Sequence, residues 1–530
     1  MGRALQYRIP VAMSTQHPDN ARMPFWLSES DIIAGDDEVF EAYWSYSSLG
    51  CDEQMWDWEG KDSDPYVVRK LFQRFPSFFK ERILGVDVFL TYRIPNPFVE
   101  EVEKKSVVEV LESIPRFYDV AKAFYGPKCP PPVFEVILPV TSSTRQILAI
   151  YNAYRTLIAG RDLIKVDPDL SIVELIGESK PRIINVIPLI EDYKSVLKTY
   201  EIVLNYLNRT KLRYQRVFIA RSDPALNYGL IPAVILSKVA LGQLELVEKE
   251  TGIPIYPIIG AGVPVFRGGL TPCTLDSFLR EYAGYYTTTV QSAFKYDFEF
   301  DKVVGAIRVL KESLPKLRGK RDYSWIRERT EDLTKIIEVV SKRYMKIIIG
   351  FSNAVNDISN LIPRRRSRRL HIGLFGYPRG VMGVRLPRAI KFCCAMYTMG
   401  IPPELVGASA LSELSEESFE LLEDLYLNMK EDLKRAGGFL SWRNINYFTS
   451  CKEVYEGFTR RYGLLEFIKM IEEDIAYLEE NIGIRIGANS VQERIHENAV
   501  NNFILAYSIG DEEKAIKYLV EAANVRRFLG

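Results

Sequence analysis

Polar side chains follow several short apolar runs in this chain, and their types suit acid–base and metal chemistry. His17 follows the first run, in AMSTQHPDN, and is one of three histidines among 530 residues. Glu191 follows the run IINVIPLI, and Asp223 follows RVFIARS. Histidine titrates near neutral pH and can move a proton, whereas Mg²⁺ takes oxygen ligands that include one or two carboxylates. We therefore expect proton transfer at His17 and a divalent cation held by Glu191 and Asp223.

Side chains that bind anions follow the other apolar runs. Arg93 comes after VDVFLTY, Arg145 comes after VFEVILPV in TSSTR, and Arg267 comes after IPIYPIIGAG. Gln291 lies near the end of YYTTTVQSA, and Arg388 lies in VRLPRAI, beyond the run HIGLFGY. The guanidinium group presents a planar fork of donors to phosphate or carboxylate. Several arginines around two carboxylates indicate metal-assisted chemistry on a small phosphorylated acid.

These residues also have ordinary structural explanations. A single histidine at a strand end is often a turn or core residue, and Glu191 or Asp223 can cap a following helix. The Gly-Gly after Arg267 is typical of a turn. The run RRRSRR at 364–369 is typical of a solvated basic loop or a nucleic-acid patch. Because Lys+Arg and Asp+Glu both total 69 and no nucleic-acid motif is recognised, we expect no nucleic-acid partner.

The elements that must position these side chains are predicted to be strands buried on both faces. Short apolar runs rich in Ile and Val alternate with helical patterns, which favours a (β/α)8 TIM-type barrel with helical insertions. An open doubly wound sheet is the alternative, and the count of eight strands is partly guided by the resemblance described below. The predicted strands lie at 9–15, 86–92, 133–140, 183–191, 216–223, 253–262, 285–293 and 371–377.

The chain is predicted to have two parts. Residues 1–400 form the barrel with its inserted helices and carry the active site. Residues 401–530 read as helix after helix, for example SEESFELLEDLYLNMKEDLKRA and LLEFIKMIEEDIAYLEENI. No flexible linker separates the two parts, so we expect the helical C-terminal region to pack on the barrel.

Composition indicates a soluble cytoplasmic protein. The six cysteines form no CxxC pair and are too sparse for a disulfide framework. The N-terminal segment reaches polar residues within a few positions and is no signal peptide, and we find no apolar run near twenty residues. We therefore expect no membrane partner.

Several of these strand ends, in order, resemble those of phosphoenolpyruvate carboxylases, and most closely the short archaeal-type branch. MSTQHPDN is signature-like for that branch and places His17 at the family's catalytic histidine. TYRIPNP is similar to the family's DRDGNP and keeps Arg93 and Asn96 in register. IPLIE is similar to VPLFE, and ARSDPALNYG is similar to the family's peptide around its metal aspartate. These two peptides put Glu191 and Asp223 on metal-ligand positions.

The remaining motifs extend the resemblance to most of the barrel. VFRGGLTP resembles IGRGGAP and makes Arg267 an active-site arginine, and TTVQSA keeps Gln291 in register. NLIPRRRSRR and VRLPRAIKF propose Arg364 and Arg388 for phosphate or bicarbonate, and Arg145 matches a further family arginine.

Four family positions differ in this chain. The long branch has a His, two arginines and a Lys at these positions. This chain has Ile259, Ala261, Val140 and Leu226 instead. The missing positive charge is expected from Arg93, Arg221, Arg379 or Arg385.

The resemblance implies carboxylation of phosphoenolpyruvate by bicarbonate to oxaloacetate and inorganic phosphate, through carboxyphosphate and an enolate, as in anaplerotic CO2 fixation. It implies Mg²⁺ or Mn²⁺ on Glu191 and Asp223, and His17, Arg267 and Arg388 as catalytic residues. It further implies a homotetramer and a substrate-binding set of Arg93, Asn96, Arg145, Gln291 and Arg364. The alternatives are another metal-dependent lyase of the phosphoenolpyruvate/pyruvate barrel enzymes and, from a different class, a scaffold or RNA-binding protein.

One segment has no counterpart in the long branch. GCDEQMWDWEGK, at 50–61, is acidic and aromatic. It is expected to be a solvated loop, or a lid over the barrel mouth with Asp57 and Lys61 as functional candidates and two tryptophans that exclude water.

Overall fold

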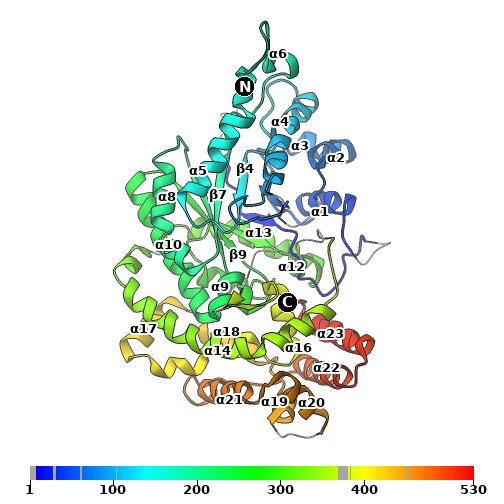
Figure 1. The fold of residues 1–530 in the computed structure, drawn as a ribbon, viewed down its shortest axis with the longest axis vertical. Helices are drawn as coiled ribbons and strands as arrows, with labels where there is room; N and C mark the ends of the chain where they lie inside the picture. Colours follow the sequence, from blue (N-terminus) through cyan, green and yellow to red (C-terminus); the bar gives the residue numbers. More distant parts are fainter. Residues whose placement is uncertain are drawn as a thin grey trace.

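Eight parallel strands form a closed barrel in the computed structural model, which describes residues 8–27, 32–59, 63–102, 104–320, 322–367, 380–381, 383–449 and 453–530 (Figure 1). The strands follow one another around the barrel in the order β1-β10-β9-β8-β7-β4-β3-β2. Their bounds are β1 Ala12–Ser14, β2 Glu53–Asp57, β3 Phe89–Arg93, β4 Glu135–Leu138, β7 Asn185–Ile190, β8 Gln215–Ala220, β9 Ile255–Gly260 and β10 Thr287–Val290. The predicted (β/α)8 barrel is confirmed, and the open sheet was wrong.

Seven of the eight predicted strands are present, and the remaining strand of the barrel is one that was not predicted. The barrel closes through β2, in the segment that was expected to be a loop or lid, and all five β2 residues are buried. Trp56 and Trp58 lie in a hydrophobic core cluster beneath the helices. The expected strand at 371–377 lies outside the described residues, as does Lys61.

Paired charges explain how a polar segment forms a barrel strand. Glu53 on β2 accepts hydrogen bonds from both terminal nitrogens of Arg216 on β8, at 2.8 and 2.7 Å, and Arg216 also pairs with Glu135 on β4 at 2.9 Å. These charges are buried inside the barrel near the start of the strands. Above them lies an apolar layer that includes Met13, Met55, Ile137, Ile187, Phe218 and Ile258. The barrel is therefore a filled core whose opposite end carries the loops.

Helices cover the barrel and form the C-terminal region. The predicted helical pattern SEESFELLEDLYLNMKEDLKRA is interrupted between Leu425 and Met429, whereas LLEFIKMIEEDIAYLEENI forms one helix over Leu465–Glu480. The helices are α1 Asp36–Ser47, α2 Val67–Arg74, α3 Pro76–Glu81, α4 Ser106–Tyr125, α5 Thr144–Ala153, α6 Ile172–Ile176, α7 Tyr193–Leu197, α8 Thr199–Leu207, α9 Ser222–Tyr228, α10 Leu230–Thr251, α11 Leu275–Glu281, α12 Ser292–Tyr296, α13 Phe300–Leu317, α14 Thr330–Leu361, α16 Ala389–Thr398, α17 Glu416–Leu425, α18 Met429–Gly437, α19 Trp442–Thr449, α20 Glu453–Tyr462, α21 Leu465–Glu480, α22 Val491–Ser508 and α23 Glu512–Arg526.

The C-terminal helices lie together on one side of the barrel, at the bottom of Figure 1. One hydrophobic cluster runs from strands β8 and β9 through α10 and α14 into α16 to α23. Arg343 on α14 adds a salt bridge of 2.7 Å to the buried Asp474 on α21. The division into two parts at residue 400 stays a prediction.

One helix meets the length and hydropathy of a membrane span. Helix α10, Leu230–Thr251, has a mean hydropathy of 1.7 over its most apolar window, so the expectation that no such run exists was wrong. However, 89% of that window is buried within the protein, as in the core helix of a globular fold.

Candidate functional site

The carboxyl ends of the parallel strands bring most of the predicted site residues to one end of the barrel. Arg93 ends β3, His17 follows β1, and Glu191 follows β7 directly. Asp223 lies in the first turn of α9, just after β8. Arg267 and Gln291 lie in the loops after β9 and β10 and contact each other.

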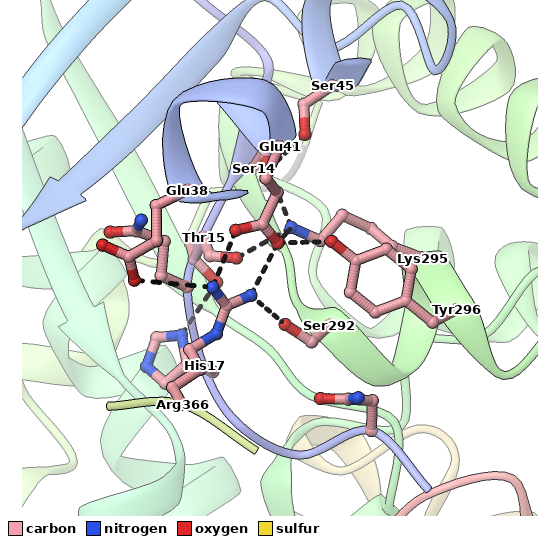
Figure 2. Close-up of polar contacts among 12 residues, drawn as sticks. Ser14, Thr15, His17, Glu38, Glu41, Ser45, Ser292, Lys295, Tyr296 and Arg366 are labelled. Atoms are coloured by element: carbon pink, nitrogen blue, oxygen red, sulfur yellow. Dashed lines mark hydrogen bonds and ion pairs between the residues drawn. The ribbon is translucent and has the colours of Figure 1, made fainter. Parts of the chain in front are cut away.

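His17 is held by its own neighbour in the sequence. The Oγ1 of Thr15 lies 2.8 Å from Nδ1 of the imidazole, and the ring is half-buried (Figure 2). Arg366, from the basic run, is drawn in the same view, and its buried guanidinium donates to Glu41 and Ser292. The Thr15 hydroxyl therefore orients the imidazole ring through Nδ1.

Arg267 is the most extensively bonded arginine of the site. Its Nη1 donates to Oδ2 of Asp19 at 3.1 Å and to the carbonyl of Gly530 at 2.6 Å, and its Nη2 donates to Gln291. Its Nε donates to the Oγ of Ser222 at 3.1 Å. Four of the five guanidinium hydrogens are used by described residues, so one Nη2 hydrogen is left for an anion.

Gly262 makes room for this arrangement. A Cβ at residue 262 would lie 3.0 Å from Cζ of Arg267 and 3.2 Å from Oε1 of Gln291, closer than ordinary van der Waals contact. The small residue therefore lets the guanidinium approach the end of β9.

Arg93 and Arg388 share acidic partners on the segment that begins with β2. Asp57 accepts a bidentate pair from Arg93 at 2.8 and 2.6 Å, and Glu59 lies 3.3 Å from each of the two arginines. Burial disfavours the charged guanidinium of Arg93, but the carboxylates of Asp57, Glu59 and Glu191 outweigh it and raise its pKa above the ordinary value. Arg93 is therefore a permanent cation within electrostatic reach of Glu191.

Glu191 is oriented by an unusual backbone position. Its Oε2 accepts a hydrogen bond of 2.9 Å from the N–H of Val140, and Val140 has a φ of 50°, in the left-handed region. A β-branched residue rarely adopts this conformation, and such strain is found at functional sites. The strained peptide points its N–H at one carboxylate oxygen.

Glu191 and Asp223 suit a hard divalent cation. They follow adjacent strands, β7 and β8, and offer carboxylate oxygens. Among the described residues, no group of three or more His, Cys, Asp or Glu side chains could hold a metal. Carboxylate oxygens are the ligands that Mg²⁺ takes from proteins, together with waters and substrate oxygens.

The other predicted residues occupy different environments. Asn96 is fully buried, and its Nδ2 donates to the carbonyl of Pro139 at 2.7 Å, so it holds the end of β4. Arg145 is exposed on α5, where it lines a surface hollow of about 560 Å³ with Arg209. Arg364 is exposed as well. The substrate-binding roles of these three residues stay predictions.

Sequence reasoning missed several residues of the site. Asp19 lies in the same octapeptide as His17, so motif position was an available signal. Glu59 follows a strand that was not recognised. Arg366 was indistinguishable from its neighbours in the basic run, because composition does not say which of them turns inward.

The candidates for the missing family charges are also dispersed. Arg221 is buried and its Nε donates to the hydroxyl of Tyr282 at 2.9 Å, on the side of the C-terminal helices. Arg385 is exposed, and Arg379 lies outside the described residues.

Comparison with known proteins gives one consistent result. The family model described as phosphoenolpyruvate carboxylase matches residues 9–530. The chain is 43% identical over 522 residues to a phosphoenolpyruvate carboxylase of Caldivirga maquilingensis, covering 98% of this chain and 99% of the relative. It is 43% identical over 525 residues to that of Picrophilus torridus, with the same coverage. It is 39% identical over 523 residues to that of Methanothermobacter thermautotrophicus, covering 99% of this chain and 100% of the relative.

Proposed function

The chain belongs to the phosphoenolpyruvate carboxylase family, and from this membership we propose how its residues divide the work of the reaction. The enzyme is a carboxy-lyase that forms oxaloacetate and inorganic phosphate from phosphoenolpyruvate and bicarbonate. The resemblance to the archaeal-type branch is confirmed, because the curated relatives are archaeal and match over nearly their full length. The alternative of another barrel lyase has no support from these comparisons.

The family depends on a divalent metal, and we assign its binding to Glu191 and Asp223. Mg²⁺ is the proposed ion, with Mn²⁺ as the substitute. When bound, the cation supplies charge stabilisation for the enolate and the phosphoryl oxygens. Val140 fixes one oxygen of Glu191 through its N–H, so the carboxylate is oriented before any ligand arrives.

Arg267 and Arg388 are the proposed anion-binding arginines of the catalytic step. Bicarbonate attacks the phosphorus of phosphoenolpyruvate, which gives carboxyphosphate and the enolate of pyruvate. Negative charge moves onto the transferred phosphoryl group, and guanidinium groups held in place beforehand stabilise that charge without reorganising. The contacts of Arg267 with Asp19, Gln291 and Ser222 supply this rigidity.

His17 is the proposed general base. Its Nε2 accepts the proton of carboxyphosphate as that intermediate separates into CO2 and phosphate, and the enolate then attacks CO2. Thr15 holds Nδ1, which orients the ring for this transfer. Water must be kept from the enolate during this step, because water would protonate it to pyruvate.

The observation that supports these roles most is the ion pair between Asp19 and Arg267. It links the octapeptide of His17 to the loop after β9 through a buried ion pair of 3.1 Å, although the two residues are 248 positions apart. The test is oxaloacetate formation measured with and without bicarbonate for the wild type and for His17→Asn. We expect bicarbonate-dependent turnover that falls by about 10²–10⁴-fold in the variant.

The remaining features are proposals of the same kind. A homotetramer and a cytoplasmic location follow from the family resemblance and the ordinary composition. The neutral net charge supports the absence of nucleic-acid and anionic-membrane partners. Sedimentation at catalytic concentrations tests the tetramer.

A further inference from the structure

Three fully buried charged side chains form a cluster that contacts the end of β1 at Ser14 and Thr15 and is not used by the proposed chemistry. Glu41 comes from α1, Lys295 from α12, and Arg366 from the basic run, and the side chains of all three are 0% exposed (Figure 2). We call them the Glu41 network. Arg366 donates to both oxygens of Glu41, at 2.7 and 2.6 Å, and to the Oγ of Ser292 at 3.0 Å.

Lys295 connects this network to the strand that carries His17. Its Nζ donates to Oε1 of Glu41 at 2.8 Å, to the carbonyl of Thr15 at 2.9 Å and to the Oγ of Ser14 at 3.1 Å. An ammonium group has three donors, and all three are used. The hydrogen bond from Lys295 holds the backbone of Thr15, and the hydroxyl of Thr15 contacts Nδ1 of His17.

The network holds two cations and one carboxylate, with Glu38 lying 3.6 Å from Arg366 as a second carboxylate, and such charges are costly to bury. Burial disfavours the carboxylate of Glu41, but Arg366 and Lys295 outweigh it and lower its pKa below the ordinary value. A buried ion pair is weak evidence for stability, because apolar side chains of similar volume often do as well. Its rigid hydrogen-bond geometry is better suited to orienting a neighbouring group.

We propose that Lys295 is a positioning residue for His17. Through the Thr15 carbonyl it fixes the backbone at the end of β1, the Thr15 hydroxyl fixes Nδ1, and Nε2 is thereby aimed at carboxyphosphate. This inference rests on the proposed role of His17 as the base.

The reaction provides a readout that a folding defect does not move. Each turnover forms one phosphate and one oxaloacetate. If Nε2 is misplaced, bicarbonate still attacks phosphorus, but water hydrolyses the carboxyphosphate to bicarbonate and phosphate. No CO2 is delivered to the enolate, which takes a proton from water and leaves as pyruvate. Loss of folded protein lowers both products equally, whereas loss of positioning raises phosphate relative to oxaloacetate.

The test compares Lys295→Met with Lys238→Met. Lys238 is a matched control because it is equally buried and pairs with a buried carboxylate, Glu281, at 2.9 Å, with Tyr282 and Tyr323 as its other neighbours. We expect Lys295→Met to lower oxaloacetate formation by about 10- to 100-fold and to raise phosphate above one per oxaloacetate. We expect Lys238→Met to lose stability while its product ratio stays at one.

A double variant separates positioning from an independent effect. Because Lys295 acts through His17, adding Lys295→Met to His17→Asn should reduce oxaloacetate formation no further. If Lys295→Met does not fold, Thr15→Val and Thr15→Ser replace it. The valine variant should uncouple the products, and the serine variant, which keeps the hydroxyl, should restore them.

Two outcomes would overturn the inference. One is a product ratio of one in Lys295→Met and Thr15→Val, and the other is losses that multiply in the double variant. If His17→Asn itself keeps the products coupled, the base assignment fails instead. If the wild type forms no oxaloacetate, the proposed roles fail as a whole, so the three failures are distinguishable.

Discussion

Replacing Asp19 by asparagine should disable Arg267 while leaving the barrel folded. In the native protein, one oxygen of Asp19 accepts the N–H of Ala293 at 2.8 Å and the other accepts Nη1 of Arg267 at 3.1 Å. Asparagine keeps the shape but offers one oxygen for two donors. Its amide nitrogen therefore faces either a backbone N–H or the guanidinium, and repels it.

The magnitude follows from the partners that remain. A hydrogen bond to a charged group contributes about 1.5–3 kcal/mol, and loss of a buried ionic partner costs about 3–5 kcal/mol when nothing replaces it. Arg267 keeps Gln291, Ser222 and the carbonyl of Gly530, so the lower range applies. Because about 1.4 kcal/mol corresponds to tenfold, kcat/KM should fall by about 10- to 100-fold.

The assay is coupled oxaloacetate formation, with Asp162→Asn as the control. Asp162 is also buried and accepts a backbone N–H, from Ser179 at 2.9 Å, and an arginine Nη1, from Arg182 at 2.7 Å. Asp162 lies in the segment between α5 and β7, which contains none of the proposed site residues, so Asp162→Asn should change stability but not kcat/KM. An Asp19→Asn enzyme with kcat/KM within twofold of the wild type would refute the reasoning that Asp19 positions Arg267.

Three further predictions concern the metal, the barrel interior and pH. Glu191→Gln and Asp223→Asn should each raise the Mg²⁺ concentration for half-maximal activity by at least tenfold, and an unchanged metal titration would contradict the assignment. Arg216→Met leaves two uncompensated glutamates inside the barrel and should lower the free energy of unfolding by about 3–5 kcal/mol in denaturant melts; a loss below about 1 kcal/mol would count against it. Burial raises the pKa of Glu404 to about 7. Above the ordinary pKa of a glutamate, the carboxyl group is therefore deprotonated in the unfolded state but still protonated in the native state. The free energy of unfolding should therefore fall by about 3 kcal/mol as pH rises from 4.5 to 7. Glu404→Gln should remove that fall, which is measured from unfolding free energies at pH 5 and pH 8. The same pH dependence in the wild type and the variant would show that the carboxyl group is not responsible.

The glutamine replacement is apt because of how Glu404 is bonded. Its Oε1 accepts the N–H of Phe266 at 2.9 Å and the hydroxyl of Tyr397 at 2.8 Å. Its buried Oε2 has no hydrogen-bond partner among the described residues. An amide can reproduce the first oxygen and place its nitrogen where the proton of the neutral acid would be.

The sequence was sufficient for the barrel and for most strand ends, because strands buried on both faces are apolar over several residues. Strand β2 escaped this signal because Glu53 is neutralised by Arg216, which lies 163 residues away. An apolar-run criterion sees only local composition, whereas this strand is stabilised by a long-range charge pair. Motifs, in contrast, depend on neighbouring residues only, and they indicated His17, Glu191 and Asp223, which follow β1, β7 and β8 in the structure.

The basic run illustrates a second limit. Its arginines have the same side chain and neighbouring positions, yet Arg364 is exposed while Arg365 and Arg366 are buried, Arg366 against Glu41. Which arginine turns inward depends on the path of the backbone after α14 and on a carboxylate from α1. Neither is visible in a local pattern, so the sequence indicated Arg364 for the substrate and left Arg366 unassigned.

The central claim is that His17 completes a bicarbonate-dependent carboxylation at the barrel mouth. The most direct measurement is the yield of oxaloacetate and phosphate from phosphoenolpyruvate, Mg²⁺ and bicarbonate by the wild type and by His17→Asn, with bicarbonate omitted as the control. The account predicts equal yields for the wild type, none without bicarbonate, and phosphate in excess of oxaloacetate for the variant. Oxaloacetate formed by His17→Asn at the wild-type rate would contradict it.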